Sequence, residues 1–207
     1  MASLNVSHNA LILLAELLEQ TRITALNLDG LMISKLTNLS GLVNLRWASF
    51  NDNDVSKVDG LDCCLKLEEL SLNNNNITTV TGERQPHSEH STSVLYEVCN
   101  RRHFLFLVGL LKLRSLNRLS LDGNQLTHLD ASVLEQLPNL TFLSLDRNAI
   151  SSLHGIQRVR PLLELYIGNN HVSTTRDIYY LKVSVKKKKS FCFTVSCVLK
   201  CCPSYRD

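Results

Sequence analysis

The stretch that decides the fold of this 207-residue chain reads Leu67-Glu-Glu-Leu70-Ser-Leu72-Asn-Asn-Asn75-Asn-Ile77. As a template it is L-x-x-L-x-L-x-x-N-x-L, which can be laid on the chain seven times. Self-similarity at a fixed period in this range is the sequence signature of a stacked repeat architecture. The seven copies begin at Met1, Ile23, Leu45, Leu67, Leu116, Leu140 and Leu162.

The apolar slots of the template predict one short strand in each copy. Apolar residues fill all 28 of these slots, counting Met1 and Ala48. Apolar residues at i, i+3, i+5 and i+10 fit neither a continuous helix nor a long strand, which excludes an amphipathic helical protein. The x-L-x-L-x unit alternates with period two, so its leucines should enter a core while its x residues form the opposite face of a sheet.

An asparagine follows the predicted strand in most copies and indicates a turn there. Its side-chain amide can bond to backbone groups of the turn and of a neighbouring repeat. The second copy has Leu31 in this slot. The other six copies have Asn9, Asn53, Asn75, Asn124, Asn148 and Asn170.

These copies, with return halves such as Val58-Asp-Gly60-Leu61, resemble the leucine-rich repeat family. They look most like its 22-residue subclass, typified by the protein phosphatase regulator. The resemblance implies an α/β fold, a curved solenoid with a parallel sheet on the concave face and short helices or turns on the convex face. It also implies a role in phosphatase regulation or in cytoskeletal or ciliary assemblies.

The register of the copies divides the chain into four parts. The copies start 22, 22, 22, 49, 24 and 22 residues apart, and removing 27 residues restores the regular spacing. Because loop-closure cost grows only logarithmically, an insertion of this length need not unfold the stack. We therefore expect repeats one to four at 1–82, a looped or disordered insertion at 83–109, repeats five to seven at 110–182, and a disordered Lys/Cys-rich tail at 183–207. A docking loop and a spliced-in exon both remain open for the insertion.

Composition and charge narrow the class of protein. The net charge of +3 is too small to favour nucleic acid as a partner. No signal peptide is recognised, and no apolar run approaches the roughly 20 residues that cross a bilayer. The odd count of seven cysteines also argues against a disulfide framework. We expect a cytoplasmic protein, with the cilium or cytoskeleton as a more specific location and no membrane partner.

The outward strand positions form the candidate binding site. Three aromatic side chains fall there, and aromatic residues are favoured as interface anchors. Carboxylates outnumber the single arginine on this face, which predicts a partner surface with some positive charge. The candidate partner-binding residues are Trp47, Asn51, Glu69, Asn73, Arg118, Asp122, Phe142, Asp146, Glu164 and Tyr166.

No catalytic or metal constellation is expected, and no cofactor. His87, Glu89 and His90 lie within the insertion and are interpreted as solvated side chains. The tail cysteines are Cys192, Cys197, Cys201 and Cys202; Cys197 and Cys201 fit the spacing of a zinc-binding pair loosely, but no second pair or histidine lies nearby. Lipidation beside Lys186 to Lys189, or a nuclear signal there, stays open.

The sequence thus predicts an intracellular, non-enzymatic interaction module or scaffold that binds another protein through its concave sheet face. The first alternative is a truncated splice form of a larger repeat protein with no independent function. The second, motivated only by four N-x-S/T sequons, is an extracellular recognition domain.

Overall fold

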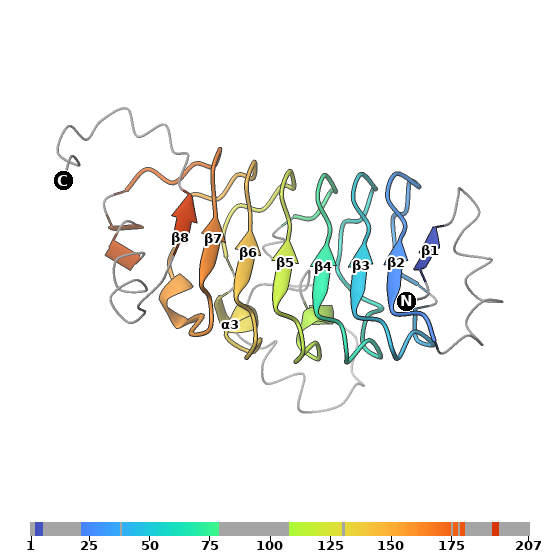
Figure 1. Cartoon of the computed structure of the whole chain (residues 1–207). Helices are drawn as coiled ribbons and strands as arrows, with labels where there is room; N and C mark the ends of the chain where they lie inside the picture. The colour runs from blue at the N-terminus through green and yellow to red at the C-terminus, as the bar shows by residue number, and fades with distance from the viewer. Residues whose placement is uncertain are drawn as a thin grey trace, which may run out of the picture.

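The structure is a computed structural model, and it forms a solenoid of parallel strands (Figure 1). It describes residues 3–5, 22–37, 39–78, 108–129, 131–174, 176–177, 179–180 and 192–194. Parts of two predicted segments, the insertion at 83–107 and most of the tail, lie outside these ranges. What the sequence predicts for them stays a prediction.

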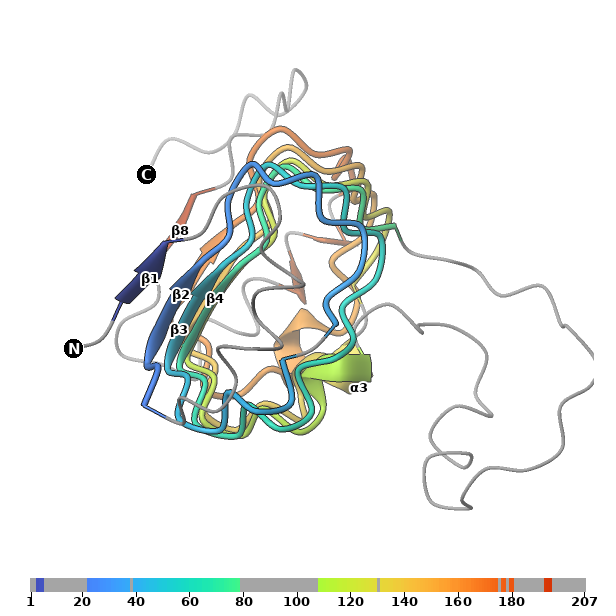
Figure 2. The same ribbon diagram turned by 90° about the vertical axis from the view of Figure 1, so that its right-hand side faces the viewer.

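Eight three-residue strands form a sheet in which every neighbouring pair is parallel and the spatial order follows the chain. The strands are β1 (Ser3–Asn5), β2 (Ala25–Asn27), β3 (Trp47–Ser49), β4 (Glu69–Ser71), β5 (Arg118–Ser120), β6 (Phe142–Ser144), β7 (Glu164–Tyr166) and β8 (Cys192–Thr194). The described helices are η1 (Val108–Leu110), α3 (Ala131–Leu134) and η2 (Ile156–Arg158). The sheet is one wall of the solenoid, and the return segments, with α3, form the opposite wall (Figure 2).

Each of the first seven strands begins two residues after the start of a template copy. The pairing register joins equivalent slots, for example Leu26 with Ala48 and Ala48 with Leu70. This confirms the predicted fold class. It also confirms the predicted placement of the strands within the repeat.

The core is one continuous column of apolar side chains between the two walls. All apolar template slots from Ile23 onward are buried, and return-half residues such as Leu61 and Leu137 join them. A three-residue strand is too short to hold together alone, so stacking between repeats must supply its stability. The 24-residue repeat contains α3, whereas the return half of the sixth copy forms the shorter η2.

The template asparagines bridge consecutive repeats, as predicted. The Asn75 side chain accepts a hydrogen bond from the Val55 N–H at 3.0 Å and donates to the Phe50 carbonyl at 2.9 Å and the Asn73 carbonyl at 3.0 Å. Equivalent bonds are made by Asn53, Asn124, Asn148 and Asn170. We call these five residues the asparagine ladder; Asn9 lies outside the described ranges.

The turn after each strand needs a left-handed backbone, which explains its Asn and Gly content. Short polar residues and glycine adopt this conformation at low cost, whereas other residues pay roughly 1–2 kcal/mol. Among the described copies, Arg147 is the one long side chain at this slot. The six residues with positive φ there are Gly30, Asp52, Asn74, Gly123, Arg147 and Asn169.

The array stays in register across the insertion, since β4 pairs directly with β5 through Glu69 and Arg118. The boundary differs slightly from the prediction, because Gly109 is buried within η1 and its N–H donates to the Val58 carbonyl at 3.1 Å. A Cβ on Gly109 would lie 2.5 Å from that carbonyl oxygen, just as one on Gly60 would clash with the Leu36 carbonyl. Gly109, the last residue of the predicted insertion, therefore packs against the preceding repeat.

The tail contributes a strand that the sequence did not predict. β8 pairs with β7, and Phe193 lies opposite Leu165. Phe193 thus occupies a slot equivalent to a template leucine, six residues later than the regular spacing would place it. The predicted disorder of the tail stays a prediction.

The asparagine ladder yields a stability prediction. Asn75→Ala removes the bonding partner of the buried Val55 N–H and Phe50 carbonyl, and we expect the free energy of unfolding to fall by about 2 kcal/mol or more. The neighbouring Asn76 is exposed and makes a 3.3 Å bond to Asp54, so Asn76→Ala should cost less than about 1 kcal/mol. Urea unfolding followed by circular dichroism measures both, and equal losses would contradict the ladder's role.

Candidate functional site

The strand register arranges the outward side chains in three rows across the sheet, which together we call the concave face. Row A contains the first residue of each strand: Ala25, Trp47, Glu69, Arg118, Phe142 and Glu164. Row B contains the third: Asn27, Ser49, Ser71, Ser120, Ser144 and Tyr166. Row C lies two residues further on: Asp29, Asn51, Asn73, Asp122, Asp146 and Gly168.

Row C forms a second hydrogen-bond ladder. The Asp122 carboxylate accepts from the Asp146 N–H at 2.8 Å and from the Ser144 hydroxyl at 2.7 Å. Asn73 accepts in the same way from the Asp122 N–H and the Ser120 hydroxyl, both at 2.8 Å. The same pair of bonds begins at Asp29 and at Asn51.

This ladder gives Asn51, Asn73, Asp122 and Asp146 an intramolecular role that the sequence analysis missed. Each was predicted to bind a partner, yet one side-chain oxygen of each is bonded to the next repeat. A signal was present, because Ser-x-Asn or Ser-x-Asp recurs in four successive copies. Their partner-binding role stays a prediction, and it rests on the atoms that the ladder leaves unused.

The hydrogen-bond ladder of row C ends at Gly168. The Asp146 carboxylate accepts the Gly168 N–H at 2.5 Å, and glycine has no side chain with which to continue the series. Burial raises the pKa of Asp146, and the charge of Asp122 raises it further, against the lowering effects of the Gly168 N–H and of Arg147. A raised pKa means that the charged form is disfavoured in the fold, so this carboxylate stabilises the fold less above its pKa than below it.

Row A, with Tyr166 of row B, brings predicted aromatic and charged residues together. The Arg118 guanidinium carbon lies 3.9 Å from the centre of the Phe142 ring. The rings of Phe142 and Tyr166 have their centres 5.3 Å apart. Trp47 is 36% exposed at the other end of the row, next to Glu69. Three successive strands thus build one cation–aromatic stack, and Trp47 lies apart from it.

Glu69 and Glu164 are half-buried and flank this stack in row A. Within the described part of the chain, neither forms an ion pair. Their cross-strand neighbours are Arg118 and Phe142 respectively. Both carboxylates are therefore available to a partner.

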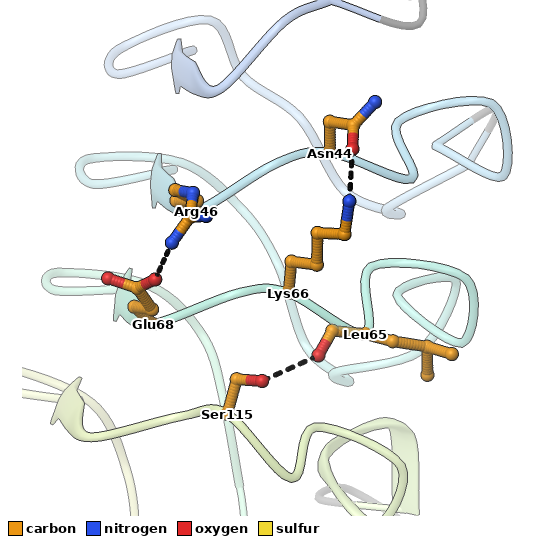
Figure 3. A network of polar contacts seen from close by, with 6 residues as sticks. All are labelled: Asn44, Arg46, Leu65, Lys66, Glu68 and Ser115. Atoms are coloured by element: carbon orange, nitrogen blue, oxygen red, sulfur yellow. Dashed lines mark hydrogen bonds and ion pairs between the residues drawn. The ribbon is translucent and has the colours of Figure 1, made fainter.

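A polar network lies beside the concave face, in the turns that precede β3, β4 and β5. Figure 3 shows Arg46 paired with Glu68 of the next repeat, Lys66 donating to Asn44 at 2.5 Å and Ser115 donating to the Leu65 carbonyl at 2.9 Å. We call the residues at 43–46, 65–68 and 112–117 the turn edge. The sequence analysis did not single it out.

The remaining candidates bring no chemistry together among the described residues. No group of three or more His, Cys, Asp or Glu side chains there could hold a metal ion. Cys63 and Cys64 are free thiols, and burial raises the pKa of Cys64 to about 11. His87, Glu89, His90 and three of the tail cysteines lie outside the described residues, as does the side chain of Cys192. In the described ranges, no helix has the length and apolar character to span a bilayer.

The second ladder can be tested separately from binding. Asp122→Ala removes the acceptor for two hydrogen bonds between repeats and should lower the free energy of unfolding by about 2 kcal/mol. Asp122→Asn keeps an acceptor oxygen and should cost less than half as much. Urea unfolding compares the two variants, and a loss as large for asparagine as for alanine would mean that charge, not the bonding pattern, matters.

Comparison with known proteins supports the repeat architecture. Residues 109–174 match the family described as Leucine rich repeat. Human Cilia- and flagella-associated protein 410 is 34% identical over 71 residues, which are 34% of this chain and 27% of that protein. The mouse protein of the same name is 32% identical over 71 residues, which are 34% of this chain and 28% of that protein. The match thus spans less than a third of the length of these curated relatives.

Solved structures share the fold. Internalin C2 from Listeria monocytogenes has a TM-score of 0.62 and 23% identity, covering 87% of this chain and 65% of that one. A chain of the Drosophila melanogaster SNF/U2A' complex has a TM-score of 0.52 and 22% identity, covering 89% and 92%. At these identities the likeness concerns the fold alone.

The repeat template, the parallel solenoid and the family match agree. Both the family and its fold are typical of non-enzymatic protein–protein interaction modules. Residues 109–174 thus match the Leucine rich repeat family, and the parallel solenoid is the fold that the repeat template predicts.

Proposed function

We propose that this chain is an intracellular, non-catalytic interaction module or scaffold that binds a protein partner through its concave face. The observation that carries the proposal is the set of three aromatic side chains on that face, Trp47, Phe142 and Tyr166. Aromatic residues and arginine dominate binding energy at protein interfaces. Repeat solenoids also present extended surfaces that suit protein partners.

Row A is better suited to binding than row C, because among the described residues no hydrogen bond joins a row A side chain to the next repeat. The Arg118–Phe142–Tyr166 stack is pre-arranged by contacts within the chain. Side chains held in place before binding lose less conformational entropy when a partner arrives. We therefore assign the main contacts to Trp47, Glu69, Arg118, Phe142, Glu164 and Tyr166.

We further propose a cytoplasmic location with association to the cilium. The support is the 34% identity to human Cilia- and flagella-associated protein 410 over 71 residues. The partners isolated from ciliated cells should accordingly be enriched in ciliary proteins over the partners isolated from cells without cilia. Equal recovery from both sources would count against the location and leave the binding face untouched.

The alternative, a truncated splice form without an independent function, makes the opposite prediction for stability. A stack whose repeats are stabilised by their neighbours should melt as a cooperative unit. We expect the full chain to give one sharp thermal transition in circular dichroism. A broad melt without a defined midpoint would favour the alternative.

The binding face is tested by the triple variant Trp47→Ala, Phe142→Ala and Tyr166→Ala. Loss of three interface anchors should weaken capture of partners by at least about tenfold, since single anchors often contribute about 2 kcal/mol. The matched control changes three exposed apolar residues elsewhere, Met32, Leu65 and Tyr179, to alanine. Quantitative pull-down compares both with the unmodified chain, and equal capture by all three proteins would refute the concave-face assignment.

A further inference from the structure

The charge of the concave face differs from that of the whole chain. The chain has a net charge of +3, yet this face carries five carboxylates and one guanidinium. The charged residues of the face are Asp29, Glu69, Arg118, Asp122, Asp146 and Glu164. The acidic character is therefore a property of this surface and does not reflect overall composition.

The arginine does not neutralise its acidic neighbour. Arg118 lies beside Glu69 across the β4–β5 pair, but its guanidinium is placed over the Phe142 ring, 3.9 Å from the ring centre. A cation held against an aromatic face is attracted by the ring itself. Arg118 thus belongs to the cation–aromatic stack. Among the described residues, Glu69 on one side of the stack and Glu164 on the other form no ion pair.

The two row A carboxylates have a fixed separation. From Glu69 the register passes through Arg118 and Phe142 to Glu164, which is three strand steps. Parallel strands lie about 4.8 Å apart, so the two backbone positions are separated by about 14 Å. Phe142 lies between the two carboxylates in row A, and its partner Tyr166 lies on the same strand as Glu164.

We propose that the concave face binds a protein segment that carries two basic side chains about 14 Å apart. One basic side chain pairs with Glu69 and the other with Glu164, and an apolar group between them contacts the cation–aromatic stack. This inference rests on the proposed function of the face. A partly buried carboxylate that a partner covers without pairing it loses hydration and gains nothing in return. Basic side chains at these two points supply the missing partners and select against acidic segments.

The turn edge has the opposite character, which sharpens the selection. Lys66 is bonded to the neutral Asn44, and Arg114 donates to the Gln136 carbonyl at 2.9 Å, so neither cation is neutralised by these contacts. Leu65 next to them is 55% exposed. A basic segment is thus attracted to the concave face and repelled by the adjacent edge, which orients it on the sheet.

The test uses the full chain as bait for a random peptide library displayed on phage, followed by binding measurements with the selected peptides. We expect selected sequences to contain at least two Lys or Arg residues around an apolar or aromatic residue. Their affinity should fall as salt is raised, because surface charges are screened. Glu69→Lys with Glu164→Lys should weaken them by at least about tenfold.

The control is Glu135→Lys, the same kind of substitution at one exposed residue that follows α3, with half the change in net charge of the double variant; it should alter affinity less than about twofold. Selected peptides without basic residues, or with unchanged affinity for the double variant, would overturn the inference, as would failure to select any peptide. If such peptides still lose binding to the triple alanine variant, the proposed binding face stands and only its charge preference is wrong. If neither variant affects them, both proposals fail.

Discussion

Hydrogen bonding between one repeat and the next is the constraint on which this structure depends. A strand of three residues buries too little surface to persist alone, so each repeat must use its neighbour as the rest of its fold. The asparagine ladder supplies this contact inside the solenoid, where the Asn75 amide bonds to three backbone groups. An amide suits the task because it donates and accepts at once, and a buried backbone group left without a partner costs about 1–3 kcal/mol.

The same constraint shapes the candidate site. On the concave face, row C carries out between repeats what the asparagine ladder does inside, with bonds such as that from the Asp146 N–H to Asp122. A residue that holds two repeats together has limited freedom to adapt to a partner. In the proposed function, binding specificity is therefore left to row A and to Tyr166; among these, Arg118, Phe142 and Tyr166 contact each other through their side chains. The face thus separates into a structural row C and a proposed recognition row A, four residues apart in each repeat.

The strands, the core and the asparagine ladder could be predicted from the sequence because they repeat: seven aligned copies reveal a slot that no single copy would. The positions of Trp47, Phe142 and Tyr166 on one face follow from the same alignment. The row C ladder was missed because a polar residue on an exposed strand face looks the same whether it bonds inward or outward. The contact between Arg118 and Phe142 was missed as well, since it depends on side-chain rotamers that the pattern does not specify.

The end of the insertion could not be predicted for a related reason. The repeat pattern assigns Gly109 to the insertion, and only the structure reveals that its N–H packs against the Val58 carbonyl.

Contacts between the repeats also explain why the array tolerates the insertion. Lengthening a connection from 22 to 49 residues adds about 0.7 kcal/mol of loop-closure cost. Across the same junction Asn124 accepts from the Ile77 N–H at 3.0 Å and Asn73 accepts from the Asp122 N–H at 2.8 Å, each contributing about 1 kcal/mol beside the leucine contacts. The contacts between repeats thus outweigh the cost of closing the longer loop. Row A therefore passes from Glu69 to Arg118 without interruption, and the proposed recognition surface extends over both halves of the array.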